Sequence, residues 1–258
     1  MPLRQISTVP PCRPLPPMEP RGRASGTAFP GADRSAAVRM YATECRSVAA
    51  GTELVAEFDD CDAIYFVVSG WMILKRILED GRQQVLDFVL PGSFVGDPTA
   101  RSRFAAFSIE ALTDAEVAVV PQRRLPDLLR TVPSLTMDLL QSAHGALANA
   151  YDSLTDVGRR TAKEAVASFL YRMERRIRDA TGSRTDGSVA FPLTQAMIAD
   201  ALGLTAEHVC RMLRSLKTQG IVALDRHGLR IADRERLADL AGILPEFEDD
   251  VPSLRLVS

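Results

Sequence analysis

The chain has 258 residues and a formal net charge of −2, with 46% hydrophobic and 25% charged residues. This composition is that of a globular protein, and it excludes a disordered chain or a histone-like polycation. At about 100–200 residues per domain, the length predicts one or two domains.

The sequence carries no pattern of export, membrane insertion or a disulfide framework. Its longest uncharged apolar stretch, residues 63–74, is shorter than the roughly 20 residues of a membrane-spanning helix. Charged residues interrupt the N-terminus, so it lacks the apolar segment of a secretory signal. The four cysteines form no Cys-x-x-Cys pair: Cys12, Cys45, Cys61 and Cys210. We expect a cytoplasmic protein without a membrane partner.

Residues 1–43 contain 8 of the 16 prolines of the chain. Proline lacks an amide donor and fixes φ, so repeated prolines oppose both helix and sheet. We therefore predict a disordered tail over residues 1–43.

Residues 44–125 predict a β domain. Short runs of β-branched and aromatic residues alternate with turns at Asp80-Gly81 and Pro91-Gly92, where glycine supplies a positive φ. The expected strands cover residues 64–68, 71–78, 83–89, 94–97, 107–111 and 116–120. Many short strands of this kind are typical of a sandwich or barrel, and we predict a small jelly roll.

Residues 126–157 predict one long helix. Its apolar residues recur at alternating spacings of three and four, the a/d pattern of a helix that packs along another helix. A helix lying on the β domain of its own chain would need a similar stripe. The small alanines allow close helix–helix approach, which favours a homodimer seam formed by Leu140, Ala143, Leu147, Ala150, Leu154 and Val157.

Residues 158–236 predict a winged helix-turn-helix. Gly203 suits the left-handed end of the first helix, and Thr205 can cap the second. Ala199 is small where the second helix crosses the first. The buried faces are expected to hold Ile198, Leu202, Val209, Met212 and Leu213. Two β runs, residues 221–224 and 228–231, then predict the wing.

The exposed face of the second helix carries groups suited to DNA. Arg211 can donate two hydrogen bonds to guanine, and Glu207 can accept one from the cytosine amino group. At i, i+4 spacing, Glu207 can also hold the Arg211 guanidinium in an ion pair. Side chains at the wing tip can contact phosphate. The predicted DNA-binding residues are Thr194, Gln195, Thr205, Glu207, His208, Cys210, Arg211, Arg214, Arg226 and His227.

The net charge averages over unlike segments. Residues 44–121 hold 6 basic and 13 acidic residues, whereas residues 158–236 hold 15 basic and 9 acidic ones. Residues 237–258 form an acidic tail, which we expect to reduce non-specific affinity for DNA by repelling phosphate.

This order of parts resembles the CRP/FNR superfamily of transcription regulators. The resemblance covers residues 44–236 and is carried by residues 64–70, 91–97 and the helix-turn-helix; residues 158–170 are similar to the FNR/FixK branch. It implies an α+β fold with a cyclic-nucleotide-binding-like β-roll, a long dimerisation helix and a C-terminal winged helix-turn-helix. It also implies a homodimer on a palindromic TTGA…TCAA-type site in double-stranded DNA, with RNA polymerase as a partner and an oxygen, nitric-oxide, redox or metabolic signal.

Departures from the family pattern bear on the ligand. The branch reads DNA with Glu-x-x-Ser-Arg, and Cys210 replaces the serine here. The Arg-Ser pair of the cyclic-AMP cassette aligns with Ala105-Ala106, although Arg101-Ser102 lies close by. The cysteines are too dispersed for an iron–sulfur cluster. We expect no cofactor, with a haem-gated or small-molecule-gated regulator as the alternative.

A cupin-like enzyme is the alternative of another class. Cupins hold a catalytic metal with clustered histidines. All three histidines (His144, His208 and His227) lie outside residues 44–121. We therefore predict no catalytic residues and no metal site.

Overall fold

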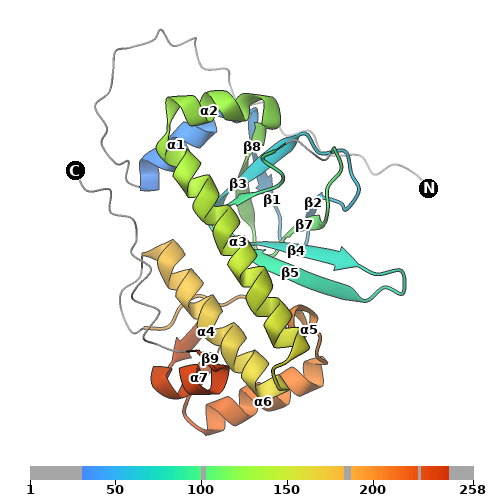
Figure 1. Ribbon diagram of the computed structural model, residues 1–258, viewed down its shortest axis with the longest axis vertical. Helices are drawn as coiled ribbons and strands as arrows, with labels where there is room; N and C mark the ends of the chain where they lie inside the picture. Colours follow the sequence, from blue (N-terminus) through green and yellow to red (C-terminus); the bar gives the residue numbers. More distant parts are fainter. Residues whose placement is uncertain (1–30, 100–102, 183–186, 226–227, 244–258) are drawn as a thin grey trace.

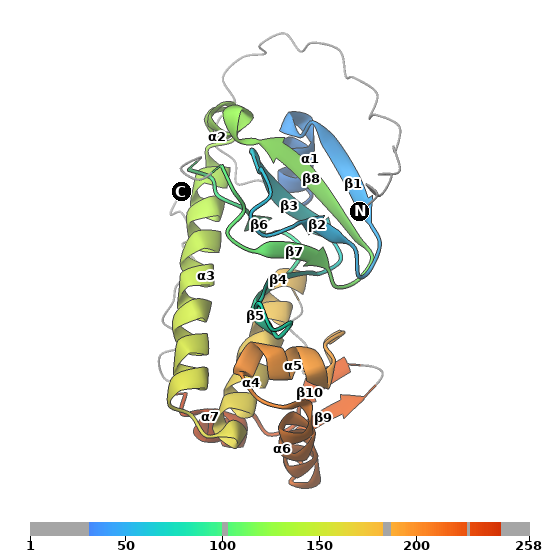
Figure 2. The same cartoon turned by 90° about the vertical axis from the view of Figure 1, so that its right-hand side faces the viewer.

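The computed structural model describes residues 31–99, 103–182, 187–225 and 228–243. Figures 1 and 2 show a β-sandwich at one end, a helical domain at the other, and the long helix α3 running past both. No helix among the described residues is long and apolar enough to cross a membrane.

The β-sandwich consists of two four-stranded antiparallel sheets. One has the order β1 (Glu44–Val48), β8 (Ala115–Pro121), β3 (Ala63–Ser69), β6 (Phe94–Val95); the other has the order β2 (Glu53–Val55), β7 (Ser108–Ala111), β4 (Met72–Ile77), β5 (Gln83–Val89). This is the connectivity of an eight-stranded jelly roll, so the predicted fold is confirmed. The short strands β1 and β2 were not among the expected strands.

A helix precedes the sandwich where the sequence predicts disorder. α1 (Gly31–Tyr41) follows the last proline of the N-terminal segment. Its Val38 is fully buried against Ile64 and Phe66 of β3. The predicted disorder is therefore wrong for residues 31–41, because contact with the sheet stabilises a weakly amphipathic helix. Residues 1–30 lie outside the described residues.

The single helix expected over residues 126–157 is two helices. After the short 3-10 helix Gln122–Arg124, α2 (Leu125–Thr131) and α3 (Ser134–Gly158) are separated at Val132 and Pro133. Val132 adopts φ −129° and ψ 80°, since a residue before proline is sterically excluded from the helical region. Leu128 and Leu135 anchor both helices on the sandwich.

The apolar stripe of α3 is exposed in the single chain. Its six predicted seam residues are all exposed: Leu140, Ala143, Leu147, Ala150, Leu154 and Val157. Most of the stripe therefore does not pack against the β-sandwich of the same chain, although Ala143 lines a cavity beside it.

The C-terminal domain holds α4 (Ala162–Thr181), α5 (Gln195–Leu202), α6 (Ala206–Thr218), β9 (Val222–Asp225), β10 (Gly228–Ile231) and α7 (Arg234–Ala241). Thr161 and Glu164 form a capping box that starts α4. The core of the C-terminal domain is continuous with the outer face of the β4–β5 sheet. There Phe88 contacts Phe169 edge-on, with 5.9 Å between the ring centroids. One hydrophobic core thus joins the two domains.

The C-terminal boundary also differs from the prediction. α7 crosses the expected start of the acidic tail at residue 237, and Leu237, Ala238 and Ala241 are buried in the domain core. Asp233 caps its start and Gly242 ends it in a left-handed conformation. The domain therefore includes α7, and residues 244–258 lie outside the described residues.

Candidate nucleic-acid interface

Local hydrogen bonds set the start and end of both helices in the helix-turn-helix. The Thr194 hydroxyl accepts from the Met197 amide at 3.2 Å, and the Thr205 hydroxyl accepts from the His208 amide at 3.2 Å. Gly203 ends α5 with φ +64°, a conformation that glycine adopts without a steric cost. The turn therefore fixes the direction of α6 relative to α5.

α6 has one buried and one exposed face. Val209, Leu213 and Leu216 pack into the domain core, whereas Met212 is half-buried. On the other face, the structure exposes five of the predicted DNA-binding residues: Thr205, Glu207, His208, Arg211 and Arg214. Cys210 is half-buried between the two faces. The polar face is thus available to a partner along more than two turns.

The two arginines of this face border a hollow. It measures about 350 Å³ and is lined by Arg211, Arg214, Ser215, Thr218 and Gln219. The last three residues were missed by sequence reasoning, which stopped at the second turn of α6. Continuing the i, i+4 and i+7 spacing from Arg211 would have found Ser215 and Thr218.

The ion pair that the i, i+4 spacing of Glu207 and Arg211 allows within α6 is not formed. The described side chains of Glu207 and Arg211 make no ion pair or hydrogen bond with each other, although they lie one turn apart. An exposed pair of this kind contributes little energy in water. Both groups are therefore free to hydrogen-bond to a partner.

The other predicted DNA-binding residues lie on two further elements. Thr194 and Gln195 are exposed at the start of α5. β9 and β10 form the predicted wing, but Arg226 and His227 at its tip lie outside the described residues. The exposed Arg230 on β10 is a further cation of the wing.

A cavity of about 280 Å³ lies between the β-sandwich and α3. Among the described residues that line it, Arg176 is the one cation, and its Nη1 already donates to Asp87 Oδ1 at 2.8 Å. Ala105 and Ala106 supply no charge, and Arg101-Ser102 lies outside the described residues. The described lining therefore does not fit a cyclic phosphate, which needs an available cation.

The described cysteines do not fit an iron–sulfur cluster either. Cys45 lies on β1, Cys61 precedes β3 and Cys210 lies on α6. A cluster requires ligands grouped around one point. No group of three or more histidine, cysteine, aspartate or glutamate side chains among the described residues could hold a metal ion.

Comparison with known proteins assigns both parts of the chain. Residues 45–132 match the family model of the cyclic nucleotide-binding domain, and residues 164–240 match that of the Crp-like helix-turn-helix domain. The chain is 33% identical over 201 residues to the transcriptional activator protein FnrL of Cereibacter sphaeroides, covering 76% of this chain and 80% of the relative. The chain belongs to the CRP/FNR family of transcription regulators.

Other CRP/FNR relatives support the resemblance to the FNR/FixK branch. The nitrogen fixation regulation protein FixK of Bradyrhizobium diazoefficiens is 34% identical over 196 residues, covering 74% of this chain and 79% of the relative. The solved structure of FixK2 from Bradyrhizobium japonicum aligns with a TM-score of 0.66 and 31% identity, over 76% of this chain and 96% of that chain. The CRP/FNR chain is therefore a DNA-binding transcription regulator and not an enzyme, and the cupin-like alternative is wrong.

Proposed function

We propose that the protein binds a palindromic TTGA…TCAA-type site as a homodimer. Arg211 donates to guanine, and Glu207 accepts from the cytosine paired with it. The observation that carries this proposal is the exposed Glu207 and Arg211 on one face of α6, opposite the buried Val209, Leu213 and Leu216. The exposed Thr205, His208 and Arg214 of α6, with Thr194 and Gln195 at the start of α5, supply phosphate contacts, which position the helix without reading sequence.

The homodimer forms through the exposed stripe of α3. A continuous row of leucines and small alanines over about three heptads is costly to leave in water and suits a second copy of the same helix. A twofold axis along α3 presents two copies of α6. Two such helices read half-sites about 34–36 Å apart, one turn of DNA.

A dimer that places its two α6 helices on neighbouring half-sites can regulate transcription from the adjacent promoter. We propose a cytoplasmic activator that contacts RNA polymerase, in line with the relative named transcriptional activator protein FnrL. We propose further that it works without a resident cofactor, because the described cysteines lie on separate elements and the cavity's arginine is already paired.

The test is DNA binding by Arg211→Ala, measured by fluorescence anisotropy on an inverted repeat. We expect a loss of about 1–3 kcal/mol on the TTGA-type site and little further loss when the contacted G·C pair is replaced. Arg82→Ala is the charge-matched control, because Arg82 is exposed at the β4–β5 turn and not on α6. A variant that keeps the wild-type base preference contradicts the assignment of Arg211.

A second candidate is a regulator gated by haem or another small molecule. The cavity of about 280 Å³ favours a small molecule, because its described lining holds no histidine, cysteine, methionine or tyrosine to ligate haem iron. An absorption spectrum of protein purified without an affinity tag tests for haem, and a thermal-shift screen tests for other ligands. A Soret band or a ligand-dependent rise in melting temperature supports this candidate, and a featureless spectrum without any shift supports the cofactor-free regulator.

A further inference from the structure

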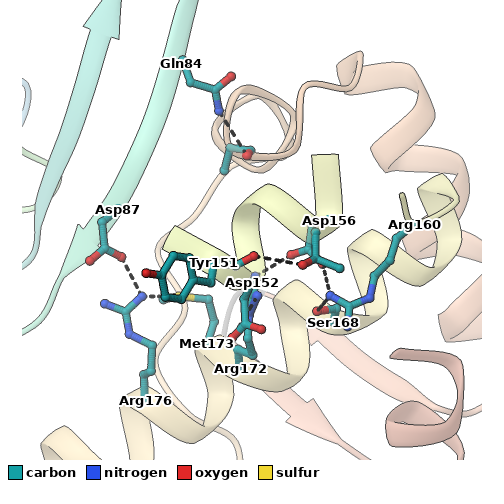
Figure 3. Close-up of polar contacts among 12 residues, drawn as sticks. Gln84, Asp87, Tyr151, Asp152, Asp156, Arg160, Ser168, Arg172, Met173 and Arg176 are labelled. Atoms are coloured by element: carbon teal, nitrogen blue, oxygen red, sulfur yellow. Dashed lines mark hydrogen bonds and ion pairs between the residues drawn. The ribbon is translucent and has the colours of Figure 1, made fainter. Parts of the chain in front are cut away.

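Strand β5 is tied to the DNA-binding domain by polar contacts. Arg176 of α4 donates to Asp87 Oδ1 at 2.8 Å and to the Phe88 carbonyl at 2.7 Å. Gln83 Nε2 donates to Asp200 Oδ2 of α5 at 2.6 Å, and Gln84 Nε2 donates to the Ala201 carbonyl at 3.2 Å. We call the Asp87–Arg176 pair the β5 latch; Figure 3 shows it beside the Gln84 contact.

A separate network joins α3 to α4. Asp156, at the end of α3, is fully buried and accepts from Arg160 Nη1 and Arg172 Nη2, each at 2.5 Å. Arg160 also donates to Ser168 Oγ at 3.0 Å. We call these four residues the helix joint; Figure 3 shows Arg172 beside Asp152, and Asp156, Arg160 and Ser168 on the side away from the latch.

The two networks hold the DNA-binding domain in different ways. The helix joint fixes the middle of α4, through Arg172, to Asp156 at the end of α3. The β5 latch lies one helical turn after Arg172 and attaches the same helix to the β-sandwich. Together with the Gln83 and Gln84 contacts and the shared core around Phe88 and Phe169, the latch restrains the angle between α6 and α3.

The two side chains of the β5 latch are largely buried, which strengthens the ion pair between them. Both side chains are about three-quarters or more buried, with 26% of Arg176 and 19% of Asp87 exposed. Partial removal of water strengthens the attraction between the charges relative to a surface pair. The second hydrogen bond, to the Phe88 carbonyl, links Arg176 to backbone as well as to a side chain.

We propose that Arg176 and Asp87 are positioning residues that determine which half-site spacing the dimer accepts. The inference rests on the proposed function, because α3 must form the twofold axis for its angle to α6 to set the distance between the two recognition helices. One added base pair moves a half-site by about 3.4 Å and rotates it by roughly 34°. A dimer with a rigid α3–α6 angle therefore rejects such a change, whereas a dimer with a free pivot tolerates it.

The experiment compares inverted repeats whose central spacer varies in steps of one base pair. Affinity is measured by fluorescence anisotropy for the wild type, Arg176→Met, Asp87→Asn and the double variant. Arg82→Met is the control, because it removes the same charge from the exposed β4–β5 turn. A duplex with a single half-site is the second probe, and thermal melts establish that each variant is folded.

We expect the wild type and Arg82→Met to prefer one spacer. Arg176→Met and Asp87→Asn should reduce the ratio between the preferred and neighbouring spacers by about tenfold, and the double variant should lose no more, as for a coupled pair. Affinity for the single half-site should not change. Latch variants that keep the wild-type spacer preference overturn the inference. A wild type that binds no inverted repeat at any spacing overturns the proposed homodimer function instead.

Discussion

Truncation of Leu147 to alanine is expected to weaken dimerisation by about 2 kcal/mol. In the single chain, 48% of this side chain is exposed. Full burial of a leucine side chain is worth about 2 kcal/mol, so covering the exposed half gains about 1 kcal/mol. Twofold symmetry places the residue in the interface twice. The dissociation constant of the dimer should therefore rise about 30-fold.

Sedimentation velocity over a range of protein concentrations measures this constant. Leu78→Ala is the matched control, because Leu78 is equally exposed, at 48%, but lies at the β4–β5 turn. We expect Leu78→Ala to leave dimerisation unchanged. An unaltered constant for Leu147→Ala, or an equal weakening by both variants, would refute the assignment of the α3 stripe as the seam.

Two further predictions concern the β-sandwich. Gly70 and Gly51 share a φ of +77°, but a Cβ at Gly70 would lie 2.3 Å from the Asp114 carbonyl oxygen whereas Gly51 faces open space. Gly51→Ala should therefore cost about 1–2 kcal/mol of unfolding free energy, and Gly70→Ala about 1–3 kcal/mol more; equal losses in urea denaturation would show that the clash is relieved. Burial raises the pKa of Tyr65, so above about pH 10 the unfolded chain releases the phenolic proton more readily than the folded one and stability falls as pH rises. Tyr65→Phe should flatten this decline in melts between pH 9 and 11, and an unchanged slope would contradict it.

Local chemistry determined much of what the sequence predicted correctly. Gly203 and Thr205 act within a few residues of their own position, so the turn of the helix-turn-helix is encoded where it forms. The break between α2 and α3 is encoded in the same way by Pro133, so a local signal for it exists. The alternation of apolar runs with glycine turns likewise predicted the jelly roll.

Only the tertiary structure decided which faces meet. Periodicity identified an apolar stripe on α3, but the fold alone leaves that stripe exposed instead of placing it on the sandwich. Asp87 and Arg176 are 89 residues apart, and Gln83 and Asp200 are 117 residues apart, so no local pattern links them. Conversely, the local spacing of Glu207 and Arg211 allows an ion pair that the fold does not form. Helix caps and turns form between residues that are close in the sequence. A long-range side-chain contact depends instead on how the complete fold brings distant segments together.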